Sequence, residues 1–321
     1  MKRAADKVVV ITGASSGAGR AMAIELAKEG AVLILSARRQ EALEEVVAEC
    51  NKLGASALAL RTDCRSAVAL EQLARTVVDL RGRIDVWINN AGVLAVGELD
   101  AIPADVNEAV VRTNLLGYIH GAHAVLPIFK QQGFGTLINN ISVGGWFATP
   151  YMAAYSASKF GLQGFSESLK GELRQFPDIH VCDLYPAFLD TPGVQHAANY
   201  TGKHLTPAPP VYDPRQVARA VVRLTERPSS VTTVGVFPHL LRLAFRSFPA
   251  WSRNITAALV ERYLDKAAVT ENTSGNVLQP VEYGTGIDGG WRNNSLKPAP
   301  RQQFWMLAGA AVAALYLLGR K

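Results

Sequence analysis

Short apolar segments alternate with longer amphipathic segments along most of the chain. Helical patterns such as GRAMAIELAKEG and ALEQLARTVVDLRG lie between the apolar segments. Unbroken apolar strands that alternate with amphipathic helices predict a parallel sheet covered on both faces, which is a doubly wound, Rossmann-like α/β fold with three layers. The expected strands are 8–12, 32–36, 57–61, 85–89, 136–141, 180–185 and 231–236.

The periodic pattern weakens towards the C-terminal third of the chain. Residues 187–213 show little periodicity and carry four prolines, which is typical of a functional loop, and we expect this loop to cover a substrate. Helical periodicity then returns before a stretch rich in Asn, Gly and Pro. The chain is therefore expected to divide into a catalytic domain (1–240), a helical extension (241–270), a linker or loosely draped tail (271–303) and an apolar segment (304–319).

Composition and charge narrow the class of protein. The chain has 321 residues and a net charge of +6, but its Lys and Arg residues are dispersed rather than gathered in a stripe, so we expect no nucleic-acid partner. The three cysteines are far apart and predict neither a disulfide framework nor a zinc site. His120 and His123 share a helical spacing, but no third ligand lies nearby, so no metal site is expected.

The apolar segment 304–319 carries no charge and no polar face. As a helix its 16 residues would span roughly 24 Å, against about 30 Å for the hydrocarbon core of a bilayer. Snorkelling by flanking basic residues would close that gap, so one interpretation is a membrane anchor. The other is a helix packed on the domain or on a partner subunit. The polar linker favours the anchor, and the catalytic domain, which has no export signal, is then expected on the cytoplasmic face.

A glycine-rich turn, TGASSGAG, follows the first expected strand and opens the first expected helix. Gly13, Gly17 and Gly19 permit a tight turn and a close backbone approach to a phosphate, which the helix N-terminus attracts. The spacing differs from GxGxxG, and a plain turn is the alternative. The strand-to-helix context favours a dinucleotide site.

The second expected strand ends in LSARRQ. Folds that prefer NAD place a carboxylate at this point for the ribose hydroxyls, whereas folds that prefer NADP use an arginine for the 2′-phosphate. Ala37 occupies the acid position and Arg38 follows it, so the sequence predicts NADP(H) as the cofactor. Arg39 is a competitor for the same role.

The stretch YSASK places Tyr155 and Lys159 four residues apart in a segment with helical periodicity. Positions i and i+4 lie on one face of a helix, so the phenol and the ammonium can serve one site. An ordinary surface pair is the alternative, and neighbouring motifs must decide between the two.

Several motifs together resemble the short-chain dehydrogenase/reductase family. They are TGASSGAG, Asp63, NNAG at 89–92, Asn114 in RTNLLG, Ser142 in NNISVGG, and YSASK. They occur in the order and spacing of that family over roughly residues 7–240. The resemblance implies hydride transfer between a nicotinamide ring and a carbonyl or alcohol carbon.

The same resemblance implies roles for particular residues. Tyr155 would be the general acid or base, Ser142 would align the substrate oxygen, Lys159 would hold the nicotinamide ribose, and Asn114 would organise a proton-relay water. Ala18 and Ala187 depart from the family pattern on the nicotinamide side. The implied cofactor-binding residues are Gly13, Ser15, Ser16, Gly17, Gly19, Arg38, Asp63, Asn90, Tyr155, Lys159 and Thr191.

Aromatic residues around the expected site favour an apolar carbonyl or secondary alcohol as the substrate. They are Trp146, Phe147, Tyr151, Phe188, Tyr200 and Tyr212, and packing in the core is the alternative for each of them. Family habit implies a homodimer or homotetramer. A catalytically idle NADP-binding sensor or scaffold is the alternative function, because a fold does not fix a function.

Overall fold

A seven-stranded parallel sheet forms the centre of the protein, in a computed structural model that describes residues 4–235 and 237–292. Its strand order is β3-β2-β1-β4-β6-β7-β9, so the order reverses beside β1, as in doubly wound nucleotide-binding folds. The predicted fold class is confirmed. The strands are β1 (Val8–Thr12), β2 (Val32–Ala37), β3 (Ser56–Arg61), β4 (Val86–Asn89), β6 (Gly135–Asn140), β7 (Ile179–Pro186) and β9 (Val231–Val234).

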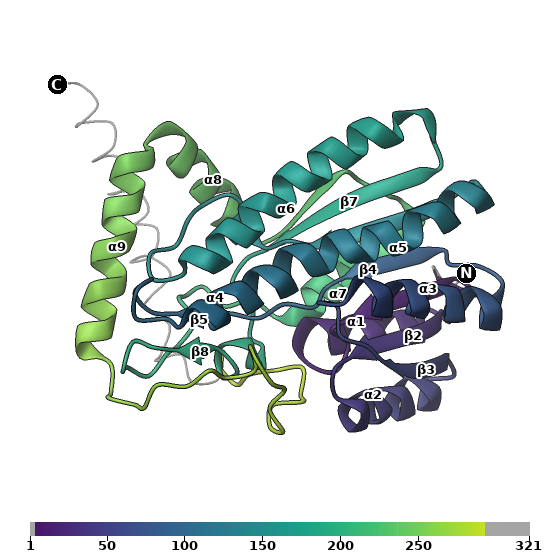
Figure 1. Ribbon diagram of the computed structural model, residues 1–321. Helices are drawn as coiled ribbons and strands as arrows, with labels where there is room; N and C mark the ends of the chain where they lie inside the picture. The colour runs from purple at the N-terminus through teal and green to yellow at the C-terminus, as the bar shows by residue number, and fades with distance from the viewer. Residues whose placement is uncertain (1–3, 236, 293–321) are drawn as a thin grey trace.

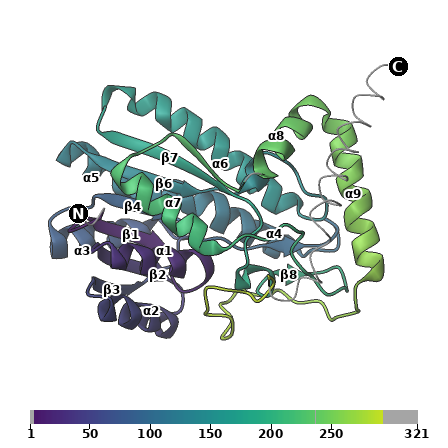
Figure 2. The same cartoon turned by 180° about the vertical axis from the view of Figure 1, so that it is seen from behind.

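Helices cover both faces of this sheet. Figure 1 shows α3, α5 and α6 in front of it, and Figure 2 shows α1 and α7 on the opposite face. Because side chains alternate along a strand, Val9 and Ile11 of β1 pack in one core cluster, and Val8 and Val10 pack in the other. The helices are α1 (Gly17–Lys28), α2 (Gln40–Lys52), α3 (Ala67–Arg81), α4 (Ala104–Val111), α5 (Gly117–Gln132), α6 (Ala153–Glu172) and α7 (Pro214–Glu226).

The segment expected to be a substrate loop contains short regular elements. Residues 198–199 form β8, which pairs in parallel with β5 (Ala95–Val96), and Leu189 forms an isolated bridge with Tyr212. The β5–β8 pair fixes the loop after β7 against the loop after β4, and the Leu189–Tyr212 bridge joins the two ends of the loop after β7. The loop therefore lies next to the carboxyl ends of the central strands.

Two helices follow the sheet, α8 (Phe237–Ser247) and α9 (Pro249–Lys266). Phe248 separates them, and Pro249 occupies the first turn of α9, a position that tolerates the missing proline N–H. Both figures show α9 at the edge of the molecule, beyond α8.

Beyond α9, the described chain runs beside β8 (Figures 1 and 2). Residues 271–292, which fall in the range expected to be a linker or loosely draped tail, make backbone and side-chain hydrogen bonds to the domain. The apolar segment 304–319 lies outside the described residues. Within residues 4–235 and 237–292, none of the helices is both long and apolar enough to cross a membrane.

Candidate active site

Three of the four residues expected to be catalytic meet at the carboxyl end of the sheet. Tyr155 and Lys159 lie one turn apart on α6, and Ser142 follows the end of β6. The Lys159 Nζ atom lies 5.7 Å from the centre of the Tyr155 ring and 5.1 Å from that of Tyr118. The phenol and the ammonium are thus brought together, as the helical spacing predicted, and the Ser142 hydroxyl lies within hydrogen-bonding reach of the phenol.

Lys159 is almost fully buried, with 4% of its surface exposed. Its ammonium donates one long hydrogen bond, 3.4 Å, to the backbone oxygen of Asn140, which also accepts a 2.8 Å bond from the Tyr118 hydroxyl. Burial away from water disfavours the charged form and lowers the pKa of Lys159 from 10.5 to about 7. The lysine therefore changes its charge near neutral pH.

Burial acts in the opposite sense on Tyr155. It raises the pKa of the phenol above its usual value, and a hydrogen bond with Ser142 works against that rise. Ser142 has a φ of 101°, a region that non-glycine residues rarely adopt, and its Oγ accepts a 3.2 Å hydrogen bond from the Gly144 backbone N–H. Such backbone strain is typical of functional positions.

Asn114 lies in a π-helical turn, Arg112–Leu116, and its side chain faces the loop after β4. The amide oxygen accepts a 2.8 Å bond from the Val93 N–H, and the amide nitrogen donates a 2.8 Å bond to the Val93 carbonyl. The side chain therefore fixes the backbone of this loop. Its expected part in holding a water molecule stays a prediction.

A ladder of buried amides connects β4 and β6 to α6. The Asn89 amide donates to the Asn139 oxygen at 3.0 Å, and the Asn139 amide donates to the Ser166 hydroxyl on α6 at 2.9 Å. This ladder fixes the helix that carries Tyr155 and Lys159 against the sheet. The sequence analysis did not identify it, although the repeated NN at the ends of both strands was a signal.

Close contacts require glycine at two positions, Gly13 in the turn between β1 and α1 and Gly19 in the first turn of α1. A Cβ atom on Gly13, which has a φ of 67°, would lie 2.6 Å from the Ala91 Cα, and one on Gly19 would lie 2.1 Å from the Gly13 oxygen. Asn90 connects this turn to β6, because its amide donates to the Thr12 and Gly13 oxygens and its oxygen accepts from Asn140 at 2.8 Å.

The rest of the turn faces the loop after β7. Ser15 lies within the turn, Ser16 precedes α1 without a side-chain capping bond, and Gly17 begins the helix. A Cβ atom on Gly17 would lie 3.2 Å from the Thr191 Cβ, so Thr191 approaches the N-terminus of α1. The structure therefore brings together Gly13, Gly17, Gly19, Asn90 and Thr191.

Charged residues gather where β2 and β3 end. Arg38 follows β2 and Asp63 follows β3, and each affects the pKa of the other. Asp63 forms an ion pair of 2.6 Å with Arg65, which helps to hold the pKa of the carboxyl below its usual value despite burial. Arg65 adds positive charge beside Arg38, a contribution that the sequence analysis missed. Arg39 bonds separately to the Val281 carbonyl.

The aromatic residues expected around a substrate pack in part against each other and against α8. The Trp146 ring stacks on Tyr185 at 4.0 Å, and the Phe147 ring lies 6.5 Å from Phe188 and 5.2 Å from Phe245. Trp146 and Phe147 are buried. They form an apolar wall beside the strained segment that begins at Ser142.

The residues at this edge fit a dinucleotide. Side chains at Gly13 and Gly19 would collide with neighbouring backbone atoms, so only bare backbone fits beside the N-terminus of α1. A helix N-terminus attracts anions. The Arg38 guanidinium donates to the neutral backbone carbonyls of Asn276 and Val277, partners that do not neutralise its positive charge. The buried Asn140 Oδ1 has no hydrogen-bond partner and is a free acceptor at the same edge.

A doubly wound sheet with a glycine-rich turn and a Tyr-Lys-Ser set at its carboxyl edge defines a nucleotide-binding oxidoreductase. The chain belongs to the short chain dehydrogenase family, whose model matches residues 7–200. An oxidoreductase of Bacillus subtilis (strain 168), YxnA, is 30% identical over 291 residues, which cover 89% of this chain and 80% of the relative.

Two further proteins are also similar. Estradiol 17-beta-dehydrogenase 11 of Mus musculus is 28% identical over 274 residues, which cover 83% of this chain and 90% of the relative. A variant of the actinorhodin polyketide ketoreductase, solved with NADPH, superposes with a TM-score of 0.65 at 29% identity and covers 71% of this chain and 95% of that chain.

Proposed function

We propose that this protein is an NADP(H)-dependent oxidoreductase that transfers a hydride between nicotinamide and an apolar carbonyl or secondary alcohol. The observation that carries the proposal is the convergence of the buried Lys159 with the half-buried Tyr155 and Ser142, at a site that Asn140 and Asn90 connect to the glycine-rich turn. When bound, the cofactor would supply or accept the hydride at its nicotinamide ring.

Tyr155 is the general acid in reduction and the general base in oxidation in this proposal. In reduction its hydroxyl donates a proton to the substrate oxygen, and Ser142 donates a hydrogen bond that holds the same oxygen in place. The raised pKa keeps the phenol protonated at neutral pH, which is the form that reduction requires. Oxidation requires the tyrosinate, so we expect the rate of oxidation to increase relative to the rate of reduction as the pH rises.

Lys159 supports Tyr155 through its charge. An ammonium near the phenol favours the tyrosinate that is left after proton transfer, and the attraction is stronger in a site from which water is excluded. Because burial lowers the pKa of Lys159 to about 7, this support weakens in the free protein above neutral pH. Asn114 contributes by fixing the Val93 backbone.

The choice of NADP rests on the ends of β2 and β3. Arg38 would hold the 2′-phosphate, and no carboxylate stands at the position of Ala37 to repel it. Arg65 adds positive charge while neutralising Asp63. The other residues proposed to bind the cofactor are Gly13, Ser15, Ser16, Gly17, Gly19, Asp63, Asn90, Tyr155, Lys159 and Thr191.

The proposed substrate is an apolar ketone or the corresponding secondary alcohol. Trp146, Phe147 and Phe188 give one side of the site an apolar wall, and such walls suit ligands with few charges. The names of two similar proteins, an estradiol dehydrogenase and a polyketide ketoreductase, favour bulky cyclic ketones as the first compounds to test.

A screen of ketones with NADPH and of alcohols with NADP⁺, followed at the absorbance of the reduced nicotinamide, tests the proposal. Steroid and aromatic ketones should be reduced by the wild-type protein. Binding of NADPH without turnover of any member of the panel would instead favour the idle sensor or scaffold.

Two further predictions concern assembly and location. We expect a homodimer or homotetramer, which size-exclusion chromatography with light scattering would test. The segment 304–319 is proposed to tether the domain to a membrane. If the full chain and a chain that ends at Pro300 both stay in the soluble fraction without detergent, the tether is wrong.

A further inference from the structure

The described C-terminal end of the chain lies against the residues proposed to hold the dinucleotide. We call residues 276–292 the C-terminal strap. Its backbone carbonyls accept hydrogen bonds from seven groups of the domain. Five of these donors lie at α1 or just after β2 and β3: the Gly17 N–H and the side chains of Arg20, Arg38, Arg39 and Arg65. The other two are the side chains of Gln195 and His196 in the loop after β7.

Some of these contacts exclude a phosphate at the same donor. The Gly17 N–H carries a single hydrogen, and it donates to the Gly286 oxygen at 2.9 Å. Each terminal nitrogen of Arg38 donates one of its two hydrogens to a strap carbonyl, that of Asn276 or that of Val277, so a phosphate would have to share or displace these contacts. A carbonyl is a neutral acceptor, whereas hydrogen bonds from a guanidinium to a phosphate are charge-assisted on both sides and stronger. The strap therefore fills an anion site with a weaker ligand.

The strap also fills the apolar part of this edge. Val277 is fully buried and packs in the same cluster as Val93 and Ala198, and Tyr155 and Leu278 pack against that cluster. At Val277 the strap therefore passes from the arginines at the ends of β2 and β3 to the cluster against which the proposed catalytic tyrosine packs. The strap thus contacts both the phosphate-binding donors and the neighbourhood of Tyr155.

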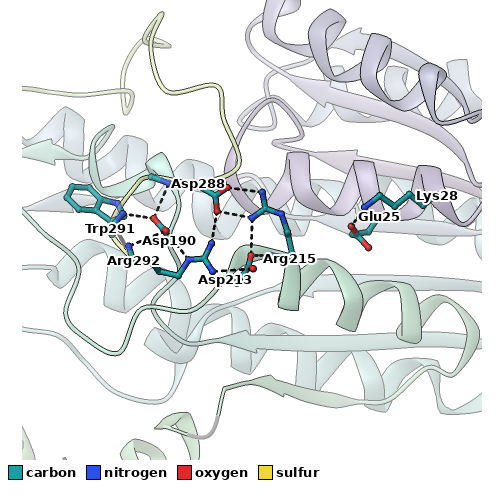
Figure 3. Close-up of polar contacts among 9 residues, drawn as sticks. Glu25, Lys28, Asp190, Asp213, Arg215, Asp288, Trp291 and Arg292 are labelled. Carbon is teal, nitrogen blue, oxygen red and sulfur yellow. Dashed lines mark hydrogen bonds and ion pairs between the residues drawn. The ribbon is translucent and has the colours of Figure 1, made fainter. Parts of the chain in front are cut away.

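A separate set of ion pairs holds the C-terminal end of the strap (Figure 3). Asp288 forms a bidentate pair with Arg215 at 2.8 Å, and Arg292 donates to Asp190 at 3.0 Å. The backbone N–H of Trp291 donates to the same Asp190 at 2.8 Å. We call Asp190, Asp213, Arg215, Asp288 and Arg292 the clasp. The clasp contains none of the residues proposed to hold the dinucleotide, although Asp190 directly precedes Thr191, which is one of them. Asp288 can therefore be changed without altering those residues.

We propose that the C-terminal strap is an intramolecular competitor of the dinucleotide. It occupies the phosphate-binding donors in the free protein and leaves them when the dinucleotide binds. This inference rests on the proposed function, because the ligand that displaces the strap is the proposed cofactor. If the dinucleotide binds only the released form, the ratio of held to released strap weakens the affinities for NADPH and NADH by the same factor.

Hydrogen exchange of the full chain gives a direct readout of the strap. We expect amide exchange in residues 276–288 to become faster when NADPH is added, while exchange in α1 becomes slower. Slower exchange in both segments would overturn the proposal, because the strap would then close over the cofactor instead of competing with it.

Two full-length variants test the same competition by affinity. Val277→Ser removes buried methyl groups from the strap without changing its charge, and we expect the Kd for NADPH and for NADH to fall by about tenfold each. Asp288→Asn weakens the clasp at a partly exposed position, and we expect the Kd to fall by about threefold. Asp265→Asn on α9 makes the same change in charge outside the strap and is the matched control.

The outcomes separate this inference from the proposed function. Tighter binding by Val277→Ser and Asp288→Asn, but not by Asp265→Asn, supports the competitor. If the wild-type protein binds NADPH and Val277→Ser binds it equally or more weakly, the competitor is overturned and the proposed function stands. If none of these proteins binds either dinucleotide in a calorimetric titration, both are overturned.

Discussion

Replacing Lys159 by methionine should abolish turnover and yet stabilise the protein at pH 6. Lys159 is 4% exposed, and its ammonium has one backbone acceptor at 3.4 Å and two aromatic rings beyond 5 Å as partners. No carboxylate is among these partners. Methionine has a similar length, fills the same space and carries no charge. The Asn140 oxygen keeps its 2.8 Å bond from Tyr118, so the substitution leaves it satisfied.

The pKa of Lys159 gives the size of the effect. Lowering it from 10.5 to about 7 corresponds, at about 1.4 kcal/mol per pKa unit, to about 5 kcal/mol of cost for holding the charge in the folded state. Methionine forfeits two cation–π contacts, each worth about 0.5–1 kcal/mol. We therefore expect the free energy of unfolding at pH 6 to increase by about 2–4 kcal/mol.

The sign of the pH dependence follows from proton binding. Between about pH 7 and 10.5 the unfolded lysine carries a proton and the folded one does not, so the unfolded state binds more protons. The stability contributed by this residue therefore rises with pH across that window, and it is lowest below pH 7. The methionine variant lacks this dependence, so its advantage should shrink as the pH rises from 7 to 10.5.

Urea unfolding of the cofactor-free protein, followed by tryptophan fluorescence at pH 6 and pH 9.5, measures both effects. Lys52→Met on the exposed side of α2 is the matched control, and we expect it to change stability by less than about 0.5 kcal/mol at either pH. A Lys159→Met protein no more stable than wild type at pH 6 would refute the reasoning. An advantage of equal size at both pH values would refute it as well, because it would not come from the charge.

Three other predictions concern the site. Tyr155→Phe should lower kcat by at least about 100-fold and leave the Kd for NADPH within about twofold, because only the transferable proton is lost; near wild-type turnover would show that another group donates it. Arg38→Ala should remove most of a preference for NADPH over NADH, and the binding free energy for NADPH in a calorimetric titration should weaken by about 1.5–3 kcal/mol. If only Arg39→Ala caused this loss, the 2′-phosphate would be bound by Arg39 instead. Ser142→Gly and Ser142→Ala should be equally inactive. The free energy of unfolding of the glycine variant should be about 1 kcal/mol higher than that of the alanine variant, because glycine tolerates the φ of 101° without strain. Equal stabilities of the two variants would contradict the strain.

The central sheet could be predicted from the sequence because its signal is local. A strand buried on both faces must be apolar throughout, and all seven expected runs coincide with strands of the sheet to within two residues at either end. The short pair β5 and β8 was not predicted, because a two-residue strand carries no periodicity. The π-helical turn that holds Asn114 has no composition that distinguishes it from an α-helix.

The candidate site divides in the same way. Tyr155 and Lys159 could be paired from the sequence because helix geometry alone places positions i and i+4 together. The strap could not be predicted, because its contacts with the arginines use backbone carbonyls, which every residue carries and which leave no mark in the sequence. Arg65 was missed for a related reason, since its partner Asp63 is only two residues away and the pair resembles an ordinary surface contact.

The unfavourable features of this molecule are concentrated where the proposed chemistry would take place. Lys159 holds a charge away from water, Ser142 has a positive φ, and the Asn140 side-chain oxygen is buried without a partner. Together they cost on the order of several kcal/mol, a large share of the 5–15 kcal/mol that typically separates folded from unfolded proteins. The fold does not require the lysine, because Tyr118 already satisfies the Asn140 carbonyl. A protein that only bound a dinucleotide would be more stable with an apolar residue at this position, so the buried ammonium beside the phenol favours catalysis over an idle scaffold.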